Sequence, residues 1–391
     1  MEKMIEVQEV NPNTFGAKIK VIGVGGGGSN MISHLINTGT WKGIELAVAN
    51  TDAQALSTSK AETRIQLGEK LTKGLGAGMK PQIGKDAALE SYEKIKDFLE
   101  GADIVFISAG LGGGTGTGAA PIIAKAAKET GALTVSIVTK PFKVEGKKRT
   151  QLAEAGYKEL KSESDSIVVI PNEKLLSIID RNLGIKDSYR IVDDVLVRAV
   201  NGMSGVILSH GADDINVDFA DVETVMNYKG LALMGIGESS GTDAAREAIK
   251  MAIESPLFDN MSINGAKGVL VHFYMNPDYP LQEVTSAMEI VENNADENAD
   301  IIFGTTTDAS VEKDKVRITI VATGFEKEVT PSSSSTTQEN DGSVLKLVNP
   351  KDMSQKINQQ DTLTARKKIS GGDFTNEEIL DIPSYLRHQM D

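Results

Sequence analysis

Short apolar, β-rich runs alternate with helical stretches over the first half of the chain. The clearest of these runs are residues 19–24, 46–49, 104–109, 133–138 and 167–170. Such alternation is typical of a parallel sheet with helices on its faces. The pattern therefore predicts an α/β fold with a parallel sheet in this half, and ligands bind such sheets at the carboxyl ends of the strands.

A different pattern follows at about 187–208, where apolar positions cover most of the circumference of a helix. They are Ile191, Val192, Val195, Leu196, Val197, Val200, Met203, Val206 and Ile207. A helix that is apolar on nearly all sides is buried. We expect a long central helix of about 33 Å that runs between two domains.

Strand-like and helical runs continue beyond this helix and predict a second, α+β domain. The strand-like runs are 268–275, 300–305 and 315–323, and the helical ones are 221–228, 243–254 and 281–291.

The composition changes at about residue 331. From there to about 373 the chain is rich in Ser, Thr, Gln, Asn, Asp and Lys and has no aromatic residue. Such a segment cannot bury enough apolar surface to offset the entropy of ordering, so a disordered linker is expected. Residues 374–391 regain apolar side chains, which suits a short tail peptide that folds onto a partner. A frayed terminus is the alternative.

The predicted organisation has six parts: a flexible N-terminal extension (1–17), a nucleotide-binding domain (18–186), the central helix (187–209), the C-terminal domain (210–326), the linker (327–373) and the tail peptide (374–391).

Two glycine-rich loops, at 23–28 and 112–118, each join a predicted strand to a predicted helix. Backbone amides at a helix N-terminus favour phosphate, so each loop is a candidate phosphate cradle. The lysine of the Walker motif follows neither loop. The phosphate charge must then be met by amides, helix dipoles and a Mg²⁺ ion held by phosphate oxygens and water rather than by the protein.

The first loop also fits the dinucleotide motif G-x-G-x-x-G at Gly23, Gly25 and Gly28. That fold needs an acidic residue about 20 positions later for the ribose, and Glu45 or Asp52 is near that distance. A dinucleotide-dependent oxidoreductase is therefore one alternative. Two loops in one sheet instead favour a single polyphosphate held from both sides.

Further candidates for nucleotide contacts lie near the end of one strand and the start of the central helix. Glu145 can accept a hydrogen bond from a ribose hydroxyl, and Arg149 can meet a phosphate. Guanine presents two adjacent N–H donors that a carboxylate of Asp193 or Asp194 can accept. Tyr189 can stack on the base.

An acidic segment after the central helix carries Asn216, Asp218 and Asp221. Ordinary helix capping explains such residues, but they can also orient and polarise a water that attacks a phosphate. The segment lies at the far end of the helix from the nucleotide side. It could reach a nucleotide only on a neighbouring subunit, and head-to-tail contacts of that kind build filaments.

Composition narrows the function classes. The chain has no cysteine, which excludes thiol catalysis and disulfides. Its net charge of −14 disfavours binding to nucleic acid or to an anionic membrane surface, and no apolar run is long enough for direct membrane insertion. Its start lacks a secretory pattern, so a cytoplasmic protein is expected. The four histidines have no metal-ligand spacing.

Together these segments resemble the tubulin/FtsZ family over about 18–325 and again at 381–387. Two positions depart from the usual family pattern: Ser29 replaces a frequent glycine, and Asp193-Asp194 replaces an Asn-Asp pair. The matching motifs are GGGTGTG (112–118), GVGGGG (23–28), LTKGLGAG (71–78), TKPF (139–142) and NVDFADV (216–222).

The resemblance implies a filament-forming GTPase of bacterial cell division, acting at the division site at midcell with GTP/GDP and Mg²⁺. A scaffold that binds nucleotide without hydrolysis is the remaining alternative. The implied nucleotide contacts are Gly26, Gly27, Gly28, Ser29, Asn30, Gly114, Thr115, Gly116, Glu145, Arg149, Asn172, Tyr189 and Asp193. The implied catalytic residues, completing the site of the next subunit, are Asn216, Asp218 and Asp221. The tail residues implied to bind FtsA-like and ZipA-like partners are Asp381, Ile382, Pro383, Tyr385, Leu386 and Arg387.

Overall fold

The computed structural model describes residues 16–39, 43–176, 179, 182–208, 215, 217–258 and 263–325. The predictions for Asn216, the linker and the tail peptide lie outside these residues. The chain divides into two compact units, and every described residue belongs to the first, residues 1–328. The predicted boundaries around the central helix therefore stay a prediction.

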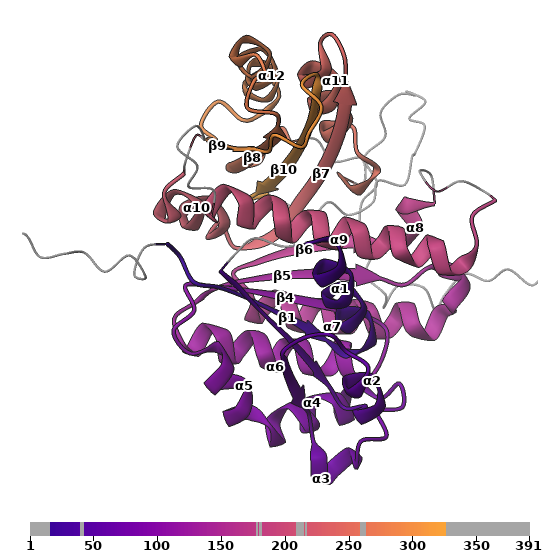
Figure 1. Cartoon of the computed structure of the whole chain (residues 1–391). Helices are drawn as coiled ribbons and strands as arrows, with labels where there is room; N and C mark the ends of the chain where they lie inside the picture. Colours follow the sequence, from indigo (N-terminus) through magenta and orange to yellow (C-terminus); the bar gives the residue numbers. More distant parts are fainter. Residues whose placement is uncertain are drawn as a thin grey trace, which may run out of the picture. The chain divides into compact units, whose positions relative to one another are not determined.

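Strands and helices alternate through the first part of the chain (Figure 1). They are β1 (Ile19–Val24), α1 (Gly25–Thr38), β2 (Ile44–Asn50), α2 (Ala53–Ser57), β3 (Thr63–Gln66), α3 (Glu69–Thr72), α4 (Pro81–Glu90), α5 (Tyr92–Leu99), β4 (Ile104–Gly110), α6 (Thr115–Glu129), β5 (Leu133–Lys140), α7 (Lys147–Glu163), β6 (Ser166–Pro171) and α8 (Asn172–Leu175).

The second part begins with the central helix and ends in a mixed part of the sheet, where β10 pairs antiparallel with β7 and β8 and β8 pairs parallel with β9. Its elements are α9 (Ile185–Leu208), α10 (Phe219–Met226), β7 (Gly230–Ser240), α11 (Ala244–Ile253), β8 (Gly268–Met275), α12 (Leu281–Asn294), β9 (Asp300–Thr307) and β10 (Lys315–Thr323).

The strands form a single ten-stranded sheet in the order β3-β2-β1-β4-β5-β6-β7-β10-β8-β9. All neighbours from β3 to β7 are parallel, which confirms the α/β prediction. β7 connects the two parts of the sheet. Its first residues pair with β6, and residues from Leu233 onward pair antiparallel with β10.

Successive strand residues point to opposite faces, and both faces of the parallel part are covered. Ile19 and Val21 of β1 pack into a core with α1, α9 and α10. Ile22 and Val24 of the same strand pack into a second core with α4, α5, α6 and α7. A strand buried on both faces needs a continuous apolar run, which explains why the sequence identified it. Figure 1 shows α9 along one side of these strands and α4–α6 on the other.

The central helix has 24 residues, which corresponds to about 36 Å. Most of its residues from Val192 onward are buried, as expected, but its first two turns are not: Ile185 is 81% exposed and Tyr189 is 40% exposed. Within the described residues, no helix is both long and apolar enough to span a bilayer.

Candidate nucleotide site

Two helices begin inside the glycine loops, at the carboxyl ends of adjacent strands. Helix α1 begins at Gly25 directly after β1, and α6 begins at Thr115 shortly after β4. Neither N-terminus has a side-chain cap, so their first amides stay available for a ligand. We expected the loops at 23–28 and 112–118 to end before their helices begin, but α1 and α6 begin inside them.

Both N-termini open on a cavity of about 390 Å³. Most of the predicted nucleotide contacts line it, and they come from α1, the loop before α6, α6 itself, the 3-10 turn Lys143–Glu145, α7, α8 and α9. They are Gly26, Gly27, Asn30, Gly114, Thr115, Gly116, Glu145, Arg149, Asn172, Tyr189 and Asp193.

At two of the cavity glycines, neither the backbone conformation nor the packing of the described residues requires a glycine. A Cβ added at Gly26 or at Gly113 would meet no atom within 4 Å, and neither residue has a positive φ. Gly116 differs, because its Cβ would lie 2.6 Å from the carbonyl oxygen of Gly110. The space beside Gly26 and Gly113 is therefore free for a ligand that approaches the backbone closely.

Gly28 and Ser29 are not among the residues that line the cavity. A Cβ on Gly28 would lie 2.4 Å from the carbonyl oxygen of Ser108, so this glycine allows α1 to pack against the strands. The Ser29 hydroxyl is buried without a hydrogen-bond partner. Both residues support the loop from behind rather than facing the cavity.

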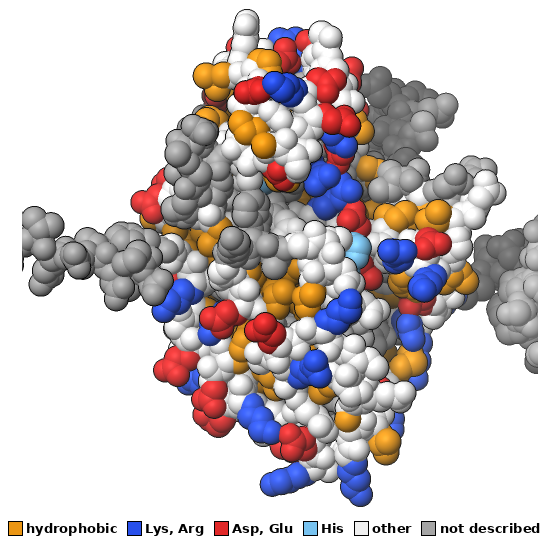
Figure 2. Space-filling model, in the orientation of Figure 1, with side chains coloured by type: hydrophobic (Ala, Val, Ile, Leu, Met, Phe, Trp, Pro, Cys, Tyr) orange, Lys and Arg blue, Asp and Glu red, His pale blue; other side chains and the backbone are white. Residues whose placement is uncertain are grey.

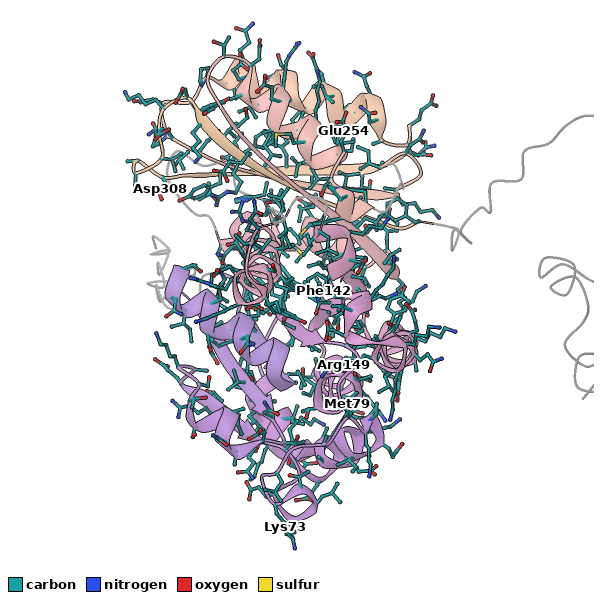
Figure 3. All side chains as sticks on the ribbon, turned by 90° about the vertical axis from the view of Figure 1, so that its right-hand side faces the viewer. Lys73, Met79, Phe142, Arg149, Glu254 and Asp308 are labelled. Atoms are coloured by element: carbon teal, nitrogen blue, oxygen red, sulfur yellow. The ribbon has the colours of Figure 1, made fainter. Side chains whose placement is uncertain are left out.

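Glu145 and Arg149 lie together at one wall, joined by the short 3-10 turn Lys143–Glu145 and the start of α7. Glu145 accepts a hydrogen bond from the backbone N–H of Phe142 at 2.9 Å and another from Arg149 at 2.6 Å. The carboxylate thus orients the guanidinium. Figure 3 labels Phe142 and Arg149 one above the other, between the labels of Glu254 and Met79.

Tyr189 closes the cavity at the start of α9. Its ring packs edge-on against Phe142, with 5.4 Å between ring centroids. Burial, and next the charge of Glu145, raises the pKa of Tyr189. The phenol therefore stays protonated near neutral pH and presents a fixed, partly exposed ring.

The two neighbouring aspartates of α9 have different surroundings. Asp193 lines the cavity. Burial raises the pKa of Asp193 to about 6, although nearby His34 partly offsets this effect. Asp194 is held by Arg198 at 2.6 Å and lies 3.5 Å from His34, so it is already occupied. The geometry favours Asp193 as the carboxylate that contacts a ligand.

Asn172, the first residue of α8, is 4% exposed and lines the same cavity. Its side-chain oxygen has no hydrogen-bond partner among the residues that the structure describes. A buried amide without a partner is unfavourable, so this atom indicates a polar ligand that supplies the missing contact.

Several cavity residues were missed from the sequence. They lie at or just after the carboxyl ends of the buried strands β4 and β5, or next to Asp193 and one turn after it on α9. These positions are the signals that could have identified them. They are Gly110, Leu111, Gly113, Thr139, Pro141, Val192 and Leu196.

The acidic segment lies elsewhere. Asp218 precedes α10 as its N-cap without making a side-chain cap hydrogen bond, and Asp221 is in the first turn of that helix. Both are exposed, and neither lines the nucleotide cavity. Asp218 instead borders a separate hollow of about 570 Å³ with Ile207, near the far end of α9.

The acids that a dinucleotide site would need are also occupied elsewhere. Asp52 caps α2 by accepting hydrogen bonds from the N–H groups of Gln54 and Ala55, at 2.9 and 3.1 Å. Glu45 pairs with Lys20 at 3.3 Å. Neither lines the cavity, which removes the support for the oxidoreductase alternative.

Comparison with known families agrees with this site. Residues 18–180 match the GTPase domain of the tubulin/FtsZ family, and residues 230–326 match the C-terminal domain of the FtsZ family. The fold and the site thus define a tubulin-like GTPase, whose ligand is a guanine nucleotide.

Comparison with individual proteins shows to which family of tubulin-like GTPases the chain belongs. A cell division protein FtsZ of Helicobacter pylori (strain J99) is 44% identical over 389 residues, which cover 98% of this chain and 96% of that protein. The solved structure of an empty FtsZ dimer of M. jannaschii has 46% identity and a TM-score of 0.76, covering 81% of this chain and 90% of that one. CetZ2 from Haloferax volcanii, solved as a GTPγS-bound protofilament, shares the fold with a TM-score of 0.67 at 20% identity, over 79% of this chain and 94% of that one. The chain belongs to the FtsZ family.

Proposed function

We propose that this protein assembles head to tail and hydrolyses GTP at a site that two copies complete together. One copy holds the nucleotide in the cavity between the two glycine loops. The next copy supplies Asp218 and Asp221. The main observation in support is the separation within one chain: the cavity lies at the start of α9, and the acidic residues follow its far end.

Each part of the nucleotide has a counterpart in the cavity. The amides at the starts of α1 and α6 bind the phosphates, helped by the positive ends of both helix dipoles. Arg149, oriented by Glu145, meets the phosphate and ribose side. Asp193 accepts hydrogen bonds from guanine, Asn172 supplies a further polar contact, and Tyr189 stacks on the base.

A Mg²⁺ ion fits this arrangement as a partner of the phosphates. Within the described ranges, no group of three or more His, Asp or Glu side chains is arranged to hold a metal ion. Phosphate oxygens and water would therefore be its ligands, with Thr115 at the start of α6 as a neutral neighbour. When bound, the ion neutralises charge on the phosphates.

Hydrolysis follows from water placed by the acidic side chains. A carboxylate of the neighbouring copy accepts a hydrogen bond from the water and orients its oxygen towards the γ-phosphorus. The new P–O bond forms as the bond to the bridging oxygen of GDP breaks. One proton of the water stays on the released phosphate as its P–OH group, and the carboxylate accepts the other and passes it to the solvent.

The resemblance extends the proposal to the cell. The protein would form filaments at the division site at midcell, and its tail, centred on Ile382, Tyr385 and Leu386, would bind FtsA-like and ZipA-like proteins. Part of this is supported by similar proteins, which are described as a dimer, a protofilament and cell division proteins. On the face in Figure 2, charges of both signs are interspersed over the described part, which does not favour nucleic acid.

Sedimentation and phosphate release, measured together over a range of protein concentrations, test the proposal. With GTP and Mg²⁺ we expect polymer and a rate per subunit that rises steeply above a threshold concentration. A rate per subunit that stays constant on dilution would reject the shared site. Polymer without phosphate release would instead indicate the non-hydrolysing scaffold.

A further inference from the structure

Four charged side chains meet where α9 passes the strands β7 and β10. The carboxylate of Glu238 on β7 accepts from Lys315 at 2.6 Å and from Arg317 at 2.8 Å, both on β10. Arg198 of α9 reaches the same carboxylate at 3.4 Å. Although burial alone would raise the pKa of Glu238, the hydrogen bonds from Lys315 and Arg317 lower it to about 2. The group is thus a permanent anion that connects a helix to a sheet.

The three contacts of Glu238 are not equivalent. Arg317 is the direct cross-strand neighbour of Glu238, and Lys315 lies two residues along the same strand, so both join β10 to β7. Arg198 alone of these three cations comes from a helix. It is held from its other side by Asp194, the residue next to Asp193 of the nucleotide cavity.

A hollow lies beside Arg198 on this face of α9. It has a volume of about 750 Å³ and separates the helix from β8, β9 and β10, and Arg198, Gly202 and Thr319 are among its lining residues. Helix and strand come close at Gly202, where an added Cβ would lie 2.9 Å from Cγ2 of Thr319. On the nucleotide side of Gly202, the side chains of Arg198 and Glu238 connect the helix to the sheet, rather than close packing of the two backbones.

We infer that Arg198 and Glu238 are positioning residues for GTP hydrolysis. Their contact fixes how the nucleotide end of α9 sits on the sheet, and through this rigid helix it sets the place of the acidic residues relative to the nucleotide of the next copy. The inference rests on the proposed function. A displacement of about 1 Å in such a geometry can lower a rate about 100-fold. Neither side chain touches the nucleotide, because neither lines its cavity.

Four variants of the full chain test this: Arg198→Met, Glu238→Gln, the double variant, and Lys315→Met as the matched control. Lys315 binds the same carboxylate but belongs to β10 rather than to α9. GTP affinity, the thermal unfolding midpoint, and phosphate release at saturating GTP above the assembly threshold are measured for each.

For Arg198→Met and Glu238→Gln we expect rates about 5- to 20-fold below wild type, with GTP affinity changed less than about twofold. The double variant should be no slower than the slower single variant, because both substitutions act by removing the same contact, the one between Arg198 and Glu238. Lys315→Met should stay within about twofold of wild type.

Two results would overturn the inference: Lys315→Met as slow as Arg198→Met, or single effects that multiply in the double variant. Glu238→Gln hardly changes the shape of the side chain, so the variant should stay folded. If Arg198→Met unfolds, the rate of Glu238→Gln tests the positioning role. The concentration dependence of the wild-type rate shows whether a negative result concerns the proposed function or only the positioning role. If its rate per subunit does not depend on concentration, the proposed function fails, whereas normal variants of a concentration-dependent wild type contradict only the positioning role.

Discussion

The two ends of helix α9 present opposite kinds of chemistry. At its start, Tyr189 and Asp193 line a cavity, with pKa values shifted by burial. Beyond its end, Asp218 and Asp221 are exposed, and Asp218 makes no side-chain cap hydrogen bond. The groups that recognise the ligand are pre-organised within one subunit. The acidic groups, by contrast, act only when the surface of a neighbouring copy contacts them. Binding and hydrolysis should therefore be separable by mutation.

The largest effect is expected from Asp218→Ala. Removing a group that orients the attacking water should lower phosphate release by about 100- to 1,000-fold. GTP affinity should be retained, because Asp218 does not line the nucleotide cavity. Phosphate release and nucleotide binding are measured separately, with the exposed Glu223→Ala on the same helix as the matched control.

A loss of GTP affinity as large as the loss of rate would place Asp218 in the binding site of its own subunit. Equal effects of Glu223→Ala would reduce the role of Asp218 to general surface charge. Either result would remove the contrast between the two ends of the helix.

The second prediction concerns the glycine loop at the binding end. In Gly26→Ala the added Cβ occupies the space beside the backbone and keeps the phosphate from approaching the amide closely. GTP affinity should fall by about 10- to 100-fold, as expected for the loss of a hydrogen bond to a charged phosphate. The folded protein should be as stable as wild type or more stable by up to about 1 kcal/mol, because Gly26 lies within α1 and its Cβ would meet no atom within 4 Å.

Isothermal titration and thermal unfolding check this pair of effects. Gly184→Ala is the matched control, since a Cβ there comes no closer than 4.0 Å to another atom and the residue does not line the cavity. A destabilised Gly26→Ala variant would show that this glycine serves the fold rather than the ligand.

The sequence predicted the parallel sheet because buried strands leave a continuous apolar run. The bounds of β1 and β10 were correct, but β3 and β7 were missed. Strand β3 has four residues, only one of them buried. Strand β7, GLALMGIGESS, has no alternation and three glycines, two of which lie against the backbone of α11. Its role comes from pairing with β6 and β10, which local patterns do not reveal.

The candidate site was predicted well where glycine chemistry was distinctive, and less well where neighbours on one helix had to be distinguished. Adjacent residues on a helix point about 100° apart, so the sequence could not choose between Asp193 and Asp194. Arg198, four residues after Asp194, was the missing clue, because side chains at that spacing meet. The glycines also concealed the starts of α1 and α6, since helix propensity argues against them.

The third prediction uses the pKa of Asp193, which burial raises to about 6. Only the ionised carboxylate can accept both N–H groups of guanine, so GTP affinity should fall as the pH falls through 6. Between pH 7 and pH 5 the loss should be about tenfold. The γ-phosphate titrates in the same range, so Asp193→Asn is the reference: its affinity should be lower at pH 7 and lack this additional pH dependence.

Asp194→Asn is the second reference in that experiment. Asp194 is paired with Arg198, so this variant should keep the pH dependence of the wild type. If Asp194→Asn abolishes the dependence and Asp193→Asn retains it, the assignment of the two carboxylates is reversed.

The smallest effect is expected at Ser29, behind the glycine loop. Its hydroxyl is buried without a partner, and the residue does not line the cavity. Ser29→Ala should leave GTP affinity within about twofold of wild type and should raise the free energy of unfolding by up to about 1 kcal/mol, because it removes an unsatisfied polar group. Asn30→Ala, at the next position and on the cavity wall, should weaken GTP binding. Comparing the two affinities by titration locates the edge of the site to one residue, and a large loss in Ser29→Ala would extend the site to the rear of α1.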